Sequence, residues 1–423
     1  MTKIIPFKAL IYNQGKVSDL SKIACPPYDV ISPARQDYLH EINKHNFIRI
    51  LLGKDTPETD RYRRAAEYFK EWQKEKIFIQ DEKPCIYFYA QDFYVRGEKR
   101  TRYGFIALLY LESKSSVFGH ENTHIEAKTD RLRLLKRVKA NLSPIFVASP
   151  DKKRVIQRVY REYCKGKKPF IDITDDEKVN HRLWRIDSPE IIAKIESGMQ
   201  GENIFIADGH HRYEVACAYR DAMKEKLGSI TGDEPFNYVL SYFTDAAAGG
   251  LTIFPIHRLV KLLKPIDTEI LKSELKAYFD VEEIKERTRF FFLLEKGGRS
   301  EHIIGMYRDK KHWLLRLKNV KILDRMIQDK PQEYRRLDIC VLNYLVLKEI
   351  LKLSLDEKDV ITYSTDPDEM TQQVDSHENY IAFFLNPVKI EQIMAVALTG
   401  NKMPPKSTYF YPKVLSGLVI NKL

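Results

Sequence analysis

The sequence predicts an α+β protein with more than one subdomain, and three observations lead to this prediction. A length of 423 residues exceeds what one hydrophobic core usually supports, so two or three subdomains are expected. Internal repeats and low-complexity tracts are absent, which argues against solenoid and linker architectures. Short apolar and aromatic runs typical of strands alternate with longer runs of helical periodicity.

Composition and charge narrow the class of protein. A content of 43% hydrophobic and 30% charged residues indicates a folded domain rather than a disordered chain. The net charge of +11 would suit nucleic acid, a membrane surface or anionic metabolites, and it does not choose among them. Because basic residues are interspersed with acidic ones and form no long tail, we expect a solvated surface of mixed charge.

The ends and the cysteines bear on location. The segment Met1–Pro6 lacks an apolar signal core, and no run approaches the roughly 20 apolar residues of a membrane span, so we expect a cytoplasmic protein without a membrane partner. The five cysteines are odd in number and contain no C-x-x-C pair. Reduced and mostly buried thiols are therefore expected.

The first elements follow from local patterns. A turn is expected at Pro26–Pro27–Tyr28–Asp29, followed by a helical stretch to about Asn46 and an amphipathic helix from about Thr59 to Lys76. The aromatic and apolar runs Cys85–Tyr89 and Phe105–Tyr110 read as strands.

The pattern changes after Gly119. Asp130 is expected to cap a basic helix, and a strand is expected at Ile145–Val147. From about residue 150 to 200 the sequence is polar with a mostly helical pattern, which we interpret as an insertion or lid. A buried strand at Ile204–Ala207 and a helix from Tyr213 to Lys226 follow.

The loop between that strand and that helix, Asp208-Gly209-His210-His211-Arg212, is the first candidate site. In α/β folds such a loop directs backbone N–H groups and the positive end of a helix at an anion, so a phosphate would fit there. Gly209 allows close backbone approach, Arg212 offers two donors, and the two histidines can donate or shuttle a proton.

Asp208 could orient a histidine, hold a metal or accept a proton. The alternative is a plain helix N-terminus capped by Asp208, with the histidines satisfied by backbone carbonyls. Residue types alone do not separate a kinase from a nuclease or a nucleotide-binding module.

A second constellation is His120-Glu121-Asn122-Thr123, followed by Lys128, Asp130 and Arg131. Glu121 could act as a general base, while Lys128 and Arg131 could neutralise phosphate. The alternative for Glu121 is an exposed loop carboxylate.

The order of these pieces resembles the ParB/sulfiredoxin-type fold as free serine kinases use it. In those kinases a glutamate element supplies the base and an Asp-Gly-His-His-Arg loop binds phosphate. This chain differs by its long insertion before the loop.

More of the chain resembles a long-uncharacterised prokaryotic family that contains this core, some members of which are similar to kinases of free serine using ATP or pyrophosphate. The matching pieces are Pro26–Ser32, Gly249–Arg258 and Met403–Lys413, beside the two constellations above. The resemblance implies an α+β protein with a ParB/sulfiredoxin-like catalytic core at 111–260, an N-terminal α/β subdomain at 1–110 and a C-terminal α/β subdomain at 261–423.

The implied function is a phosphotransferase that phosphorylates the hydroxyl of free L-serine to O-phosphoserine. Its expected residues are catalytic Glu121, Asp208 and His210; phosphate-binding Gly209, His211, Arg212, Lys128 and Arg131; and substrate-binding His120, Thr123, His257, Arg258, Lys406, Ser407 and Thr408. For the last five residues an ordinary turn or surface loop is an equal alternative.

Cofactor and partners remain partly open. Mg²⁺ is expected on chemical grounds, without a ligand set that spacing reveals. No P-loop is present, so pyrophosphate, ATP and ADP are all compatible donors. Alternatives are a ParB-like nucleotide-binding regulator or DNA-associated protein, for which no DNA-reading element is found, and a phosphatase or nuclease using the same loop.

Overall fold

The computed structural model describes residues 2–57, 59–111, 116–228, 231–355 and 359–423, which form two compact units. The first unit comprises residues 1–119, 123–252 and 412–423, and the second comprises 120–122 and 253–411. The mixed α/β composition predicted from the sequence is confirmed. The three-part division at residues 110 and 260 stays a prediction.

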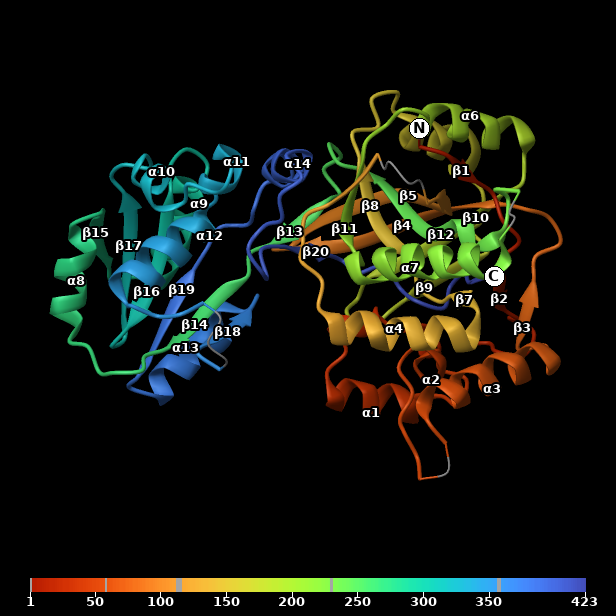
Figure 1. Ribbon diagram of the computed structural model, residues 1–423, viewed down its shortest axis with the longest axis horizontal. Helices are drawn as coiled ribbons and strands as arrows, with labels where there is room; N and C mark the ends of the chain where they lie inside the picture. Colours follow the sequence, from red (N-terminus) through yellow and green to blue (C-terminus); the bar gives the residue numbers. More distant parts are fainter. Residues whose placement is uncertain (1, 58, 112–115, 229–230, 356–358) are drawn as a thin grey trace. The chain divides into compact units, whose positions relative to one another are not determined.

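The first unit is organised around a mixed sheet in which the described residues form nine strands (Figure 1). The order is β6-β11-β8-β12-β5-β4-β10-β9, and β1 pairs with β5 beyond the end of β4. The strands are β1 (Ile4–Ile5), β4 (Ile86–Val95), β5 (Glu98–Tyr110), β6 (Val117–Gly119), β8 (Ile145–Ser149), β9 (Ile171–Thr174), β10 (Asn180–Ile186), β11 (Ile204–Asp208) and β12 (Tyr238–Asp245).

Central strands of this sheet are buried on both faces. Every residue of β12 is buried, and β4 is buried from Ile86 to Gln91. Continuous rather than alternating burial requires cover on both sides. Two smaller ribbons complete the unit: β2 (Leu10–Tyr12) with β3 (Phe78–Gln80), and β7 (Ala140–Asn141) with β21 (Asn421–Lys422).

Helices cover the sheet and position its loops. One core packs α5 and α6 against β4, β5 and β8, and another joins α4 to α7 through Leu135, Val215 and Tyr219. The helices of the first unit are α1 (Pro33–Ile42), α2 (Ile48–Leu51), α3 (Arg61–Lys74), α4 (Ile125–Val138), α5 (Val155–Val159), α6 (Pro189–Met199) and α7 (His210–Leu227), with 3-10 turns at η1 (Leu20–Lys22), η2 (Tyr28–Val30) and η4 (Pro235–Asn237) and a π-helical turn η3 (Tyr160–Cys164).

Two sequence predictions in this unit are wrong. Helix α4 begins at Ile125, with His124 as N-cap, and Asp130 lies inside the helix. Asp130 does not cap because its carboxylate binds Arg61, Tyr62 and Arg131 instead.

The segment from about 150 to 200 is not mostly helical. It contains β9 and β10, and β10 pairs antiparallel with β4 over Asn180–Ile186. Its partner lies some ninety residues earlier in the chain, so a local pattern could not reveal this pairing. The segment therefore extends the main sheet.

The second unit is built on a six-stranded antiparallel sheet, order β15-β17-β16-β19-β14-β18, among its described residues. Its core joins α9 and α13 to the sheet through Phe290, Leu294, Met370 and Val374. Strands are β14 (His257–Lys261), β15 (Phe279–Ile284), β16 (Ile303–Arg308), β17 (Lys311–Leu317), β18 (Ile361–Ser364), β19 (Tyr380–Phe384) and the pair β13 (Thr252–Phe254) with β20 (Tyr409–Tyr411); helices are α8 (Thr268–Lys276), α9 (Arg287–Gly297), α10 (Ile322–Met326), α11 (Gln332–Arg335), α12 (Asp338–Cys340), π-helical η5 (Val341–Ile350), α13 (Pro367–Ser376) and α14 (Ile390–Leu398).

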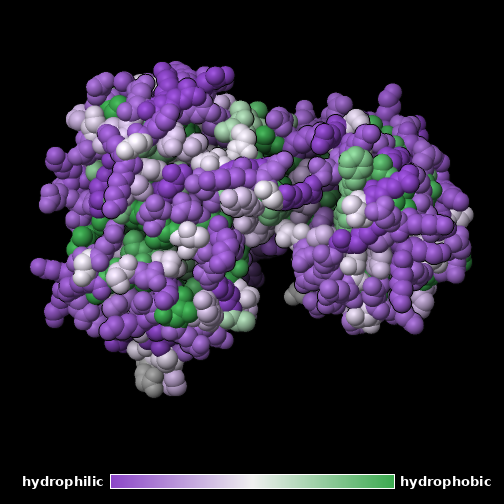
Figure 2. Space-filling view, turned by 180° about the vertical axis from the view of Figure 1, so that it is seen from behind, coloured by the Kyte–Doolittle hydropathy of each residue, from purple (hydrophilic) through white to green (hydrophobic). Residues whose placement is uncertain are grey.

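The visible surface of the molecule is mostly polar. Figure 2 shows mainly hydrophilic residues on the visible face, interrupted by smaller hydrophobic areas. Among the described residues, no helix combines the length and apolar character needed to traverse a bilayer.

Candidate phosphate site

The Asp208–Arg212 loop leaves the sheet at the end of β11 and enters α7 at His210. Gly209 is the N-cap, with φ +93°, a left-handed conformation that side chains disfavour. A Cβ atom at this position would also lie 2.9 Å from the Arg212 guanidinium. Two features therefore favour glycine at this position: the left-handed backbone conformation and the close approach of the Arg212 guanidinium.

Asp208 is held between two cations. Its Oδ2 accepts from Arg212 Nη2 at 2.6 Å, and its Oδ1 accepts from Lys413 Nζ at 2.7 Å. All three side chains are only 11–12% exposed. Burial alone would raise the pKa of Asp208, but Lys413 and Arg212 outweigh it and hold that pKa well below its usual range.

These contacts decide between the two interpretations of Asp208. The capping interpretation is wrong, because the N-cap is Gly209 and the Asp208 carboxylate binds side chains of Arg212 and Lys413. An ionised carboxylate bound by two cations is a poor proton acceptor at neutral pH. Its catalytic role stays a prediction, and its observed role is to orient Arg212.

The two histidines of the loop have different surroundings. His210 is buried, with 3% exposure. His211 Nε2 accepts from the backbone N–H of His124 at 3.0 Å, and the two imidazole rings lie 6.1 Å apart and nearly parallel. The contact ties the first turn of α7 to the N-cap of α4, so both helix N-termini lie at one place.

Two residues of the second constellation meet α7. Glu214 Oε2 accepts from Thr123 Oγ1 at 2.6 Å and from Lys128 Nζ at 3.1 Å. Arg131 is bound by Asp130 and donates to the carbonyl of Leu51. Lys128 and Arg131 are thus engaged by protein acceptors, and their predicted phosphate-binding role is untested.

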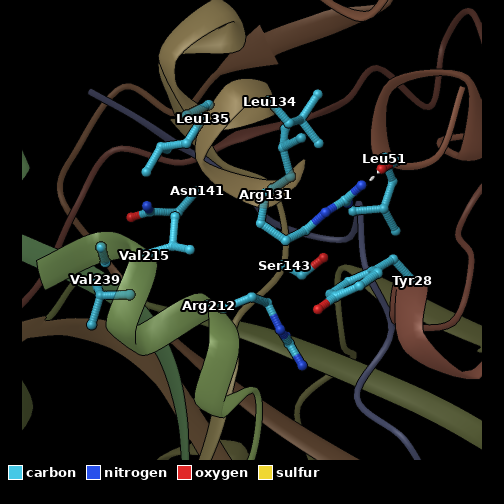
Figure 3. A pocket seen from close by; sticks show the side chains of 13 residues that line it. Tyr28, Leu51, Arg131, Leu134, Leu135, Asn141, Ser143, Arg212, Val215 and Val239 are labelled. Atoms are coloured by element: carbon cyan, nitrogen blue, oxygen red, sulfur yellow. Dashed lines mark hydrogen bonds between the residues drawn. The ribbon is translucent and has the colours of Figure 1, made fainter. Parts of the chain in front are cut away.

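A pocket adjoins Arg212, enclosing about 500 Å³ of empty space including the part open to solvent. Figure 3 shows Leu135, Val215 and Val239 on one side, with Tyr28, Ser143 and Arg131 on the other. The guanidinium of Arg131 stacks on the Tyr28 ring, 4.2 Å from its centroid. The pocket therefore joins an apolar wall to hydroxyl groups and to an arginine of the loop.

Tyr28, Asp29 and Lys413 belong to this site and were not predicted to do so. The residue Asp29 is exposed overall, but neighbouring protein atoms desolvate its carboxyl group. This desolvation, followed by the negative charge of Asp208, raises the pKa of Asp29. Burial, followed by the charge of Asp29, raises the pKa of Tyr28 to about 12. The only sequence signal was that these residues lie in pieces shared with the resembled family, which carried no role.

In the second unit, three predicted site residues lie together. Thr408 Oγ1 donates to Glu121 Oε1 at 3.3 Å and lies 3.1 Å from His120 Nε2. A hydroxyl has one hydrogen, so Thr408 accepts from a His120 that carries its proton on Nε2. His120 is fully buried, whereas the Glu121 side chain is 34% exposed.

The other predicted substrate-binding residues lie near β14. Arg258 donates to the carbonyls of Ile256 and, at 2.7 Å, of Lys406. Ser407 donates to the carbonyl of Pro404. Arg258 and Ser407 also line a hollow of about 340 Å³ together with Asp338, Asn386 and Gln392.

Comparison with solved structures gives remote similarities. A free serine kinase variant in complex with ADP is 12% identical, with 73% of this chain and 91% of that chain covered and a TM-score of 0.34. A conserved hypothetical protein from Pyrococcus furiosus is 14% identical over 73% and 94% of the two chains, with a TM-score of 0.31. SbnI from Staphylococcus aureus, truncated at its C-terminus, is 12% identical over 74% and 86%, with a TM-score of 0.37.

Similarities of this size carry no argument about function. A search of curated proteins yields no match. One family model does match, over residues 4–340, and it is described as protein of unknown function, DUF1015. Since the matched stretch covers most of the chain, the protein belongs to the DUF1015 family.

Proposed function

We propose that the protein is a phosphotransferase that moves a phosphoryl group from pyrophosphate or a nucleotide to the hydroxyl of free L-serine. The observation that supports this most is the Asp208–Arg212 loop, where a left-handed glycine opens α7 beside Arg212 and Lys413. The choice of free L-serine as the acceptor comes from the resemblance to the ParB/sulfiredoxin-like core of free serine kinases. This choice is part of the proposal.

The loop has the chemistry that an anion requires. The first N–H groups of an α-helix point out of its N-terminus, where the helix dipole favours negative charge. Arg212 is held in place by Asp208 and by the carbonyl of Pro144, so its position is fixed before a ligand arrives. Phosphoryl transfer depends mainly on such positioning and charge neutralisation.

Glu121 is the proposed general base, with His120 and Thr408 orienting it. Its partial exposure leaves the carboxylate accessible, and its bond to Thr408 shows that it accepts from a hydroxyl group. The serine hydroxyl would donate to the same carboxylate and lose its proton to it as it attacks the terminal phosphorus. The bridging P–O bond of the donor breaks, and orthophosphate or the nucleotide with one phosphate fewer leaves.

Mg²⁺ is an expected cofactor that would neutralise charge on the donor phosphates. The described residues contain no group of three or more potential metal ligands among His, Cys, Asp and Glu. This fits the usual binding of Mg²⁺ through substrate phosphates and one or two carboxylates. Asp29 is a suitable carboxylate, because Asp208 is already bound by two cations.

The test is incubation of the full chain with Mg²⁺, isotopically labelled L-serine and ATP, ADP or pyrophosphate in separate reactions. Mass spectrometry should detect labelled O-phosphoserine with at least one donor. The Glu121→Gln variant should lose turnover by about 10²–10⁴-fold while it retains donor binding.

Two other results would replace the proposal. Phosphate release without a phosphorylated acceptor would indicate a phosphatase. Nucleotide binding without turnover, together with a steeply salt-dependent affinity for duplex DNA, would indicate a ParB-like regulator.

A further inference from the structure

Lys413 reaches the candidate phosphate site from a part of the chain 205 residues away from Asp208. The ammonium lies 2.7 Å from Asp208 Oδ1 with 12% of the side chain exposed. Together with Arg212 Nη2, which donates to Asp208 Oδ2 at 2.6 Å, Lys413 places two cations on one carboxylate. Two cations on one carboxylate at a helix N-terminus favour an anionic ligand.

Two buried side chains bind the backbone carbonyls of Pro412 and Lys413. Gln91 Nε2 donates to the carbonyl of Lys413 at 2.9 Å, and Arg102 Nη2 donates to the carbonyl of Pro412 at 2.5 Å. Arg102 Nε donates to Gln91 Oε1 at 3.1 Å, so the two side chains brace each other. Gln91 is 0% and Arg102 1% exposed.

Burying the guanidinium of Arg102 is energetically unfavourable if its only role is to hold the segment at Pro412 in place. Taking a charged group out of water costs several kcal/mol, and an apolar residue of similar size often serves stability better. Arg102 lies over two neighbouring aromatic rings, 4.5 Å from the centroid of Phe146 and 5.6 Å from that of Tyr242. Its bonds to Gln91 and to the carbonyl of Pro412 hold the backbone next to Lys413 in place.

We propose that Lys413 is a further phosphate-binding residue of this site and that Arg102 and Gln91 are its positioning residues. An ammonium has three donors, so Lys413 can bind a phosphate oxygen while it keeps its bond to Asp208. This inference rests on the proposed anion site, and it does not depend on the identity of the phosphoryl acceptor.

The test is calorimetric titration of the full-length protein with inorganic pyrophosphate. The Lys413→Met variant should bind pyrophosphate about ten- to a hundredfold more weakly, as expected for loss of a charge-assisted hydrogen bond, and Lys413→Arg should recover part of the affinity. Lys422→Met is the matched control: it removes an exposed lysine of the same segment, which binds Gln73, and it should bind like wild type.

Arg102→Met and Gln91→Met test the positioning role in a double-mutant cycle with Lys413→Met. Each should weaken binding alone and add little when Lys413 is already absent, because they act through it. Full additivity would remove the positioning role. If Lys413→Met folds and binds pyrophosphate as wild type does, the lysine only secures the C-terminal segment, and the inference is wrong.

The outcomes also separate this inference from the proposed kinase activity. Weakened pyrophosphate binding in Lys413→Met without O-phosphoserine formation by wild type would support the phosphate site and reject the serine kinase. O-phosphoserine formation that is equal in wild type and Lys413→Met would support the serine kinase and reject the phosphate-binding role of Lys413.

Discussion

The His210–Arg212 turn of the first unit and the His257–Arg258 pair of the second unit have different environments. In the first unit, Arg212 binds a carboxylate and lies at the start of a helix, beside a pocket. In the second unit, Arg258 lies within β14, 2% exposed, and donates to two backbone carbonyls. Similar residue types thus serve a helix N-terminus in one unit and the interior of a sheet in the other.

The two clusters also differ in the pKa values of their titratable groups. Burial, together with Arg258, lowers the pKa of His257 to about 4, and burial lowers the pKa of Arg258 to about 10. The charge of Asp366 offsets only part of the lowering at His257. The second cluster is therefore desolvated and bound to backbone carbonyls, while in the first the Asp208 carboxylate binds both Arg212 and Lys413. The substrate-binding role of His257 and Arg258 stays a prediction.

The largest expected effect is on turnover, from Arg212→Met. Loss of a fixed cation that is proposed to contact the transferred group should lower turnover by about a hundred- to a thousandfold. The measurement is the initial rate of O-phosphoserine formation at saturating serine. Arg258→Met is the comparison variant, and an equal loss of rate in both would mean that Arg258 also serves the substrate.

Arg258→Met should act on stability instead. It leaves the carbonyls of Ile256 and Lys406 without their donor, which should lower the free energy of unfolding by about 2–3 kcal/mol. Urea unfolding is followed by tryptophan fluorescence in a Trp72→Phe/Trp184→Phe background, where the remaining Trp313 lies in the second unit and reports on it. An unchanged midpoint would contradict the structural role assigned to Arg258.

The two clusters should also respond to different ranges of acid. The folded-state pKa of His257 lies below the 6.5 of an unfolded histidine, so the unfolded state binds the proton first and stability falls as the pH drops from about 6.5 to about 4. The loss is about 3 kcal/mol when complete. Asp208 has a lowered pKa, so its contribution is present above the unfolded value of 3.8 and is lost only below it.

On acidification the contribution of His257 should therefore be lost before that of Asp208. The pH dependence of the Trp313 unfolding midpoint checks this, with His257→Gln as the variant that flattens the curve between pH 6.5 and 4. A wild-type midpoint that stays constant over that range would show that His257 is accessible to protons in the folded state.

Gly209→Ala should have the smallest effect of the series, about 1–2 kcal/mol of destabilisation from the left-handed backbone conformation. Its Cβ would also push on the Arg212 guanidinium. Pyrophosphate affinity should fall in parallel, which a change in stability alone would not cause. Gly400→Ala is a matched control, with φ +75° and no neighbouring atom within 4 Å of the added Cβ.

The sequence predicted those elements whose signals are local. The strands predicted at 105–110 and 204–207 and the helix from 213 to 226 are confirmed within β5, β11 and α7, and the strand predicted at 85–89 is confirmed from residue 86 in β4. Apolar runs and helical periodicity act over a few residues, so they can be read locally. The start of α4 was missed because its N-cap is His124, outside the usual capping residues.

Long-range partners were beyond such reasoning. Strand β10 depends on its pairing with β4, and Lys413 reaches Asp208 only through the fold. Similarly, the motif showed that Asp208 and Arg212 belong together, but not that their charges hold each other in place. Residue types indicate which chemistry a motif could perform. Charged residues from distant segments determine how its side chains are held in the folded protein.

The most direct test of the account is phosphorus NMR of the purified protein with Mg²⁺, L-serine and one donor per sample. The account predicts an O-phosphoserine resonance that grows as pyrophosphate, ATP or ADP is consumed, and that is absent with Glu121→Gln. Intact donors in every sample, with the wild-type protein folded, would contradict it.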